Sequence, residues 1–108
     1  MTVERIELAP GYRISRMIRG GWQLSGGHGD VDRERAIDDM FQFLEKGVTT
    51  FDGADIYTGV EDMYGTFRER LKQRRGEAAA QSFKVHTKFV PDWDQLGRID
   101  RSYVSAII

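Results

Sequence analysis

Residues 50–57 read TFDGADIY, and residues 86–89 read HTKF. Each stretch has the pattern of a β-strand that runs out into a loop, because β-branched and aromatic residues are followed by glycine or, after residue 90, by proline. The first strand end carries the carboxylate of Asp52 and the phenol of Tyr57, and the second carries the ammonium of Lys88. These three groups are the main candidates for chemistry in this chain.

The segments around these stretches alternate between strand and helix patterns. Residues 5–8 and 12–15 flank a proline–glycine pair, which predicts an N-terminal β-hairpin. Further strands are predicted over residues 17–22, 48–51 and 83–90. Two apolar stripes at helical spacing follow the first two of these strands, and a third helix is predicted from residue 101. The stripes consist of Ile37, Met40, Phe41 and Leu44, and of Val60, Met63, Tyr64, Phe67 and Leu71.

Capping and loop signals bound these elements. Asp30 or Asp32 is expected to cap the first helix, and Gly47 to follow its end. Residues 25–29 are predicted to form a glycine-rich loop, and residues 76–81 a connector of small residues. A hairpin followed by three strand–helix units predicts an α/β fold with a parallel sheet and right-handed crossovers.

Composition excludes several classes of function. The chain has 108 residues, 40% of them apolar, which is enough for one modest domain. Its 16 basic and 17 acidic residues argue against nucleic-acid or membrane-surface binding, which needs a basic patch. The absence of cysteine excludes disulfides and thiolate metal sites. No apolar run is long enough to span a membrane and no secretory pattern is visible, so a cytoplasmic location is expected.

The carboxylate, the phenol and the ammonium would meet if their strands are neighbours, because the C-terminal ends of parallel strands share one edge of the sheet. A free tyrosine has a pKa near 10, and a cation within about 4–6 Å lowers that pKa. Lys88 could be this cation, Asp52 could hold it charged and aimed, and Tyr57 could then donate a proton to a carbonyl oxygen. Trp22 could form a wall of the pocket.

Each group also has a plain structural interpretation. An aspartate at a strand end can be a loop cap, a tyrosine there can be a packing residue, and a lysine can simply be solvated. A metal site built from His28, His86 and carboxylates lacks ligand spacing, and a hydrogen-bonded His86 is favoured over a ligand.

The ordered set of motifs resembles the first signature of the aldo-keto reductase superfamily. The resemblance is carried by residues 47–57, by Glu61 and Gly65, by Gly-Gly-Trp at 20–22 and by Thr-Lys at 87–88. It runs from about residue 14 to the last residue, and the N-terminal hairpin resembles the one that closes the bottom of that family's barrel.

The resemblance implies a (β/α)8 TIM barrel, of which this chain would supply the hairpin and the first three βα units. It implies NADP(H)-dependent reduction of aldehydes and ketones, with a small-molecule carbonyl substrate and no nucleic-acid or membrane partner. On the matching positions, Tyr57 would be the general acid/base, Lys88 would lower its pKa, and Asp52 would pair with Lys88 near the nicotinamide ribose. Gly21 and Trp22 would face the cofactor and the substrate.

The chain departs from the family pattern at several positions. Gly53 replaces a threonine or serine and is expected to loosen the backbone there, and Arg19 places a charge late in the first strand. His28 falls where some relatives have a polar loop residue near the cofactor. The family's catalytic histidine would fall beyond Ile108, so residues 1–108 are expected to be the N-terminal part of a truncated oxidoreductase domain that is inactive alone. The alternatives are a non-catalytic fragment and a regulatory or binding subunit on the same fold.

Overall fold

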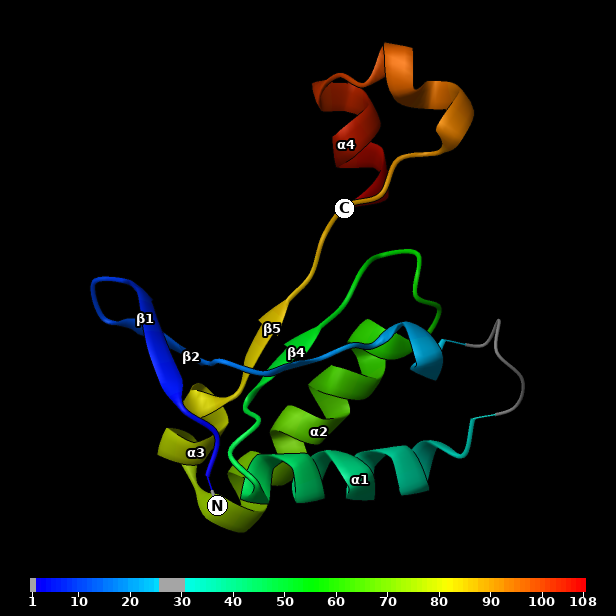
Figure 1. The fold of residues 1–108 in the computed structure, drawn as a ribbon. Coiled ribbons are helices and arrows are strands. Elements are labelled where there is room, and N and C mark those ends of the chain that lie inside the picture. The colour runs from blue at the N-terminus through cyan, green and yellow to red at the C-terminus, as the bar shows by residue number, and fades with distance from the viewer. Residues whose placement is uncertain (1, 26–30) are drawn as a thin grey trace.

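A computed structural model describes residues 2–25 and 31–108 of the chain (Figure 1). Strands β1 (Arg5–Ala9) and β2 (Tyr12–Ser15) form an antiparallel hairpin. Strands β3 (Ile18–Arg19), β4 (Thr50–Asp52) and β5 (Lys84–His86) form a parallel sheet in the order β3-β4-β5. The predicted α/β class and the predicted neighbouring of the three strands are both observed.

In the described residues, four α-helices connect and follow the strands. They are α1 (Arg33–Glu45), α2 (Val60–Arg75), α3 (Glu77–Ser82) and α4 (Arg101–Ile107). Asp32 caps α1 by accepting a hydrogen bond of 3.1 Å from the backbone N–H of Arg35. Gly47 follows the end of α1 with a left-handed φ of 92°, as a helix C-terminus favours. Asp30 and His28 lie outside the described residues, as does most of the predicted glycine-rich loop.

The core lies between the sheet and helices α1 and α2, and it is rich in aromatic rings. Phe51 of β4 is fully buried and packs against Phe67 of α2 and against Phe83, with ring centroids 6.1 and 5.1 Å away. Arg19 is aligned with Phe51 across the sheet, and its guanidinium lies 4.7 Å from the ring centroid of Phe43 on α1. A charge late in the first strand is therefore accommodated by a cation–π contact on the helix side.

The hairpin is fastened to the start of β4 by the buried hydroxyl of Ser15. The Ser15 Oγ atom accepts hydrogen bonds of 3.1 Å from the backbone N–H groups of Thr49 and Thr50, and it donates one of 2.6 Å to the carbonyl of Met17. One side chain thus satisfies two N–H groups that would otherwise be buried without a partner.

A hydrogen bond of His86 was predicted from the sequence, and the structure contains one. Its Nε2 atom lies 2.8 Å from the hydroxyl of Tyr12 on the hairpin, and the two rings stack. The side chain is half-buried between the hairpin and the sheet.

Several predicted elements differ from those in the structure. The strand predicted over residues 83–90 is limited to β5, because the chain after His86 stays extended without a regular ladder. The strand predicted over residues 17–22 is shortened because the chain turns into a 3₁₀ helix at Trp22–Leu24. The predicted connector at 76–81 is instead helix α3, since its three alanines are strong helix formers.

Beyond the sheet, a 3₁₀ helix (Trp93–Arg98) and α4 lie past the C-terminal end of β5, away from α1 and α2 (Figure 1). Within residues 2–25 and 31–108, no helix has the length and apolar composition needed to cross a membrane.

Replacing Ser15 by alanine is predicted to lower the free energy of unfolding by about 1–3 kcal/mol, because two buried N–H groups would lose their acceptor. Urea unfolding followed by circular dichroism measures the change. The control is Ser82→Ala, which removes only a hydroxyl that donates to the Ala79 carbonyl within one turn of α3. If both variants lose the same stability, Ser15 does not anchor the hairpin.

Candidate active site

The candidate residues gather where β4 and β5 end. β4 ends at Asp52 and β5 ends at His86, and these two residues are aligned across the parallel pair. Because both strands run in the same direction, the loops that follow them leave from the same edge of the sheet. This is the edge at which α/β architectures collect functional groups.

Backbone hydrogen bonds continue the pairing of the two segments beyond the strands. The N–H of Gly53 donates to the carbonyl of His86 at 2.8 Å, and the N–H of Asp55 donates to the carbonyl of Lys88 at 3.0 Å. The N–H of Val90 then donates to the Asp55 carboxylate at 3.0 Å. The extended chain after β5 therefore follows the loop after β4 closely, and this brings Lys88 alongside Asp52.

The structure brings the ammonium, the carboxylate and the phenol together. The Nζ atom of Lys88 donates to Asp52 Oδ1 at 2.9 Å and to the carbonyl of Gly53 at 2.7 Å. The same Nζ lies 5.1 Å from the centroid of the Tyr57 ring, within the range of a cation–π contact. Three groups that lie up to 36 positions apart in the sequence thus share one site.

A tight turn places Tyr57 at this edge. The N–H of Tyr57 donates to the carbonyl of Ala54 at 3.1 Å, and the N–H of Val60 donates to the carbonyl of Tyr57 at 3.0 Å. Val60 begins α2 and is fully buried, so the turn is anchored directly to the core. The ring of Tyr57 is half-buried against that core.

The charge of Lys88 is stabilised by its neighbours. The hydrogen bond that Lys88 donates to Asp52 is the main cause that raises the pKa of Lys88 above its usual value, and Tyr57 contributes in the same direction. Partial removal from water opposes this shift only in part. The side chains of Lys88 and Asp52 are 46% and 35% exposed, so the ion pair stays accessible to a small molecule.

Tyr64 and Gly21 hold the end of β4 from the helix side. The hydroxyl of Tyr64 donates to the backbone carbonyl of Asp52 at 2.7 Å. Burial raises the pKa of Tyr64 to about 12, which keeps this phenol a neutral donor. A Cβ atom on Gly21 would overlap both this carbonyl and this hydroxyl, so close packing alone explains the missing side chain. The sequence showed Tyr64 only as part of an apolar stripe, although a buried tyrosine hydroxyl needs a partner.

Trp22 and Gly53 complete the surroundings of the site. Trp22 begins the 3₁₀ helix after Gly21, and its side chain is 55% exposed. The expectation that Gly53 loosens the backbone is wrong, since both its backbone groups are hydrogen-bonded, to His86 and to Lys88. Gly21 and Trp22 as cofactor or substrate contacts remain predictions.

Comparison with known protein families matches residues 16–107 to the Aldo/keto reductase family. The chain belongs to the aldo/keto reductase family. The resemblance of its motifs to that family is thereby confirmed, and the family is one of oxidoreductases. None of the curated proteins compared with the sequence matches it significantly.

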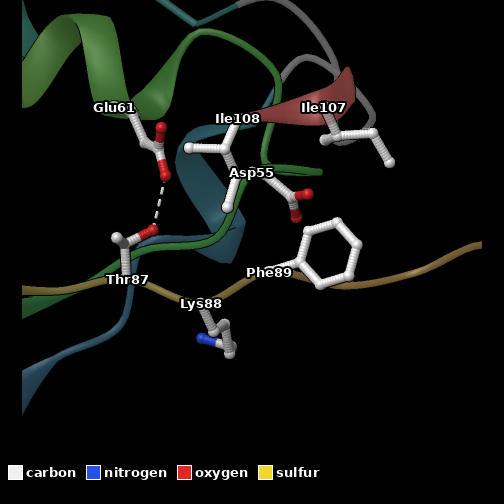
Figure 2. A pocket seen from close by; sticks show the side chains of 7 residues that line it. All are labelled: Asp55, Glu61, Thr87, Lys88, Phe89, Ile107 and Ile108. Atoms are coloured by element: carbon white, nitrogen blue, oxygen red, sulfur yellow. Dashed lines mark hydrogen bonds between the residues drawn. The ribbon is translucent and has the colours of Figure 1, made fainter. Parts of the chain in front are cut away.

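A cavity of about 350 Å³ lies next to the ion pair of this aldo/keto reductase chain, on the other side of the segment that carries Lys88. Figure 2 shows the Lys88 side chain pointing away from Glu61 and Ile108, toward the opposite side of the backbone. The cavity and the ion pair are thus separated by residues 87–89. The cavity is lined by Asp55, Glu61, Thr87, Lys88, Phe89, Ile107 and Ile108.

Metal ligands are not gathered at this edge of the sheet. Among the residues that the structure describes, no three histidine, cysteine, aspartate or glutamate side chains are grouped to hold an ion. His86 is engaged by Tyr12, and His28 falls in the part of the chain that is not described.

Replacing Gly21 by alanine is predicted to destabilise the chain by about 1–3 kcal/mol, because the new methyl group would displace the Asp52 carbonyl or the Tyr64 hydroxyl. Chemical unfolding measures the loss. The matched control is Gly20→Ala, since a Cβ there meets only the side chain of Gln23, at 3.6 Å. Equal stability of the two variants would contradict the close packing at Gly21.

Stability is predicted to fall as the pH rises from about 10 to about 12. The Tyr64 phenol ionises near 10 in the unfolded chain and at about 12 in the fold, so the unfolded state loses its proton first. Two pKa units correspond to at most about 3 kcal/mol. Lys88 adds a loss in the same direction, because its folded pKa is also raised and its stabilising charge disappears at high pH.

Urea midpoints measured from about pH 8 to about pH 12 separate the two contributions. The Tyr64→Phe variant should lose less stability over this window than the wild-type chain, because only the Lys88 contribution remains. Parallel losses in both proteins would show that burial of Tyr64 is not the cause.

Proposed function

We propose that this chain forms the first part of a (β/α)8 barrel whose complete form reduces aldehydes and ketones with NADPH. The family match, the N-terminal hairpin and the three adjacent parallel strands support this proposal. A closed barrel needs eight strands and about 250 residues, whereas the described residues supply three parallel strands. Residues 1–108 would then be the N-terminal part of the oxidoreductase domain.

The observation that carries the proposal is the contact of Lys88 with both Asp52 and Tyr57. In the proposed reaction the Tyr57 hydroxyl gives its proton to the carbonyl oxygen of the substrate while a hydride adds to the carbonyl carbon. The phenolate left on Tyr57 is stabilised by the neighbouring ammonium of Lys88. Asp52 keeps this ammonium charged and directed at the ring, through the bond of 2.9 Å.

The residues present fit part of a nicotinamide cofactor, which supplies the hydride when bound. The Asp52 carboxylate is partly exposed and can accept a hydrogen bond from a ribose hydroxyl. Trp22 offers an exposed indole surface one residue after Gly21, where an apolar ring of cofactor or substrate could pack. The choice of NADP(H) over NAD(H) comes from the family.

Replacing Tyr57 by phenylalanine is predicted to lower turnover of a generic aldehyde by at least about 10²-fold, because general acid catalysis of this kind contributes about 10²–10⁴-fold. Binding of NADPH, followed by fluorescence titration, should be unchanged. The matched control is Tyr103→Phe, since the Tyr103 hydroxyl only accepts a hydrogen bond from the N–H of Asp92 in the C-terminal segment. Near-normal turnover of Tyr57→Phe would overturn the proton-donor role.

The assay is run on the 108-residue chain and on any longer product of its gene that carries the remaining strands. Turnover in the longer product alone would assign the 108-residue chain to the non-catalytic alternative while leaving the proton donor in place. Binding of NADPH to neither protein would contradict the proposed cofactor.

A further inference from the structure

The regular ladder of the sheet ends before Lys88. The last residue of β5 is His86, and Lys88 lies two residues further along an extended segment. Its side chain is 46% exposed, and ordering a flexible lysine costs rotamer entropy. The direction in which the Lys88 ammonium points therefore depends on the backbone conformation around residue 88.

Thr87 directly precedes Lys88 in the extended chain. Successive side chains in such a chain point to opposite sides. The Thr87 hydroxyl donates to the carboxylate of Glu61, whereas Lys88 points the other way, to Asp52. Figure 2 shows Thr87 directed at Glu61 and Lys88 directed away from both. A contact that holds the Thr87 side chain toward Glu61 therefore also holds the Lys88 side chain on the opposite side of the chain, toward Asp52.

The position of Glu61 is fixed by helix α2. It lies in the first turn of α2, directly after the fully buried Val60, so its backbone is tied to the core. A negative charge in the first turn is favoured by the helix dipole. A hydrogen bond from a hydroxyl to an ionised carboxylate is stronger than a neutral one, which offsets the exposure of this contact.

Asp55 tethers the same segment by a different route. Its N–H donates to the carbonyl of Lys88, and its carboxylate accepts from the N–H of Val90. These bonds hold the backbone at residues 88 and 90 against the loop after β4. The contact between Glu61 and Thr87 adds a side-chain bond on the residue just before Lys88, and this bond resists rotation of the segment about its own axis.

We propose that Glu61 is a positioning residue for Lys88, acting through the Thr87 hydroxyl to keep the ammonium on Asp52 and beside Tyr57. Its importance for catalysis rests on the proposed function, because it assumes that Lys88 assists Tyr57. The structural part of the inference stands on the contacts alone.

The test is the pKa of the Lys88 ammonium, measured by NMR titration of the isotopically labelled 108-residue chain. The variant Asp52→Asn sets the scale, because it removes the main partner of Lys88. Thr87→Val, which removes the hydroxyl without changing any charge, is expected to lower the Lys88 pKa by about half of the fall seen in Asp52→Asn. Thr87→Ser should keep the wild-type value.

Variants at Glu61 test the same contact from the helix. Glu61→Ala should lower the Lys88 pKa about as much as Thr87→Val, whereas Glu61→Gln keeps an acceptor and should lower it far less. Combining Glu61→Ala with Thr87→Val should give no larger fall than either single change. Glu69→Ala, at an exposed glutamate further along α2, is the matched control and should have no effect.

Two results would overturn the inference: equal falls in Glu61→Ala and Glu61→Gln, which would indicate a charge effect, or an unchanged pKa in Thr87→Val. Glu61 and Thr87 are both exposed, so their variants leave the core intact, and either residue tests the contact if the other variant fails to fold. The proposed reaction fails separately, if Tyr57→Phe retains turnover, and the titration would still report on Glu61.

Discussion

The parallel pairing of β4 with β5 places Asp52 opposite His86, and two further hydrogen bonds carry the pairing on to Lys88. Side chains alternate along an extended chain, so a slip of one residue would move the ammonium to the helix side of the sheet. The ion pair therefore depends on register more than on its own attraction. In turn, the register depends on the ring of Phe51, whose burial fixes which face of β4 meets the helices.

The ion pair orients groups and adds little to stability. Partly exposed pairs contribute about 0–1 kcal/mol, because water screens the charges and the side chains lose freedom. The burial of Phe51, Phe67 and Phe83 is the larger source of stability, since each ring is almost completely removed from water. A buried aromatic layer thus supports the strands, and the partly exposed edge of the sheet carries Asp52 and Lys88.

Much of the fold was predictable because its signals are local. The apolar stripes of α1 and α2, the hairpin turn and the cap at Asp32 all follow from spacing and residue type within a few positions. The end of β5 and the helical state of residues 77–82 were missed, because an alternating pattern continues past the last ladder bond and alanines also suit a connector.

Within the site, the meeting of Asp52 and Lys88 was predictable from the rule that parallel strands end at one edge. The supporting contacts were not. The bond from Tyr64 to the Asp52 carbonyl joins a residue seen only as part of an apolar stripe to a backbone atom, which carries no sequence signal. The contact between Glu61 and Thr87 joins two exposed residues 26 positions apart, and only the folded register brings them together.

The close packing around Gly21 has a consequence for how related sequences are interpreted. The neighbouring strand and helix require a glycine at this position, whatever molecule binds at this edge of the sheet. Relatives that have lost all affinity for dinucleotides should therefore still keep it. Its presence in a newly sequenced gene indicates the same close packing of strand and helix, and it is not by itself a sign of catalysis.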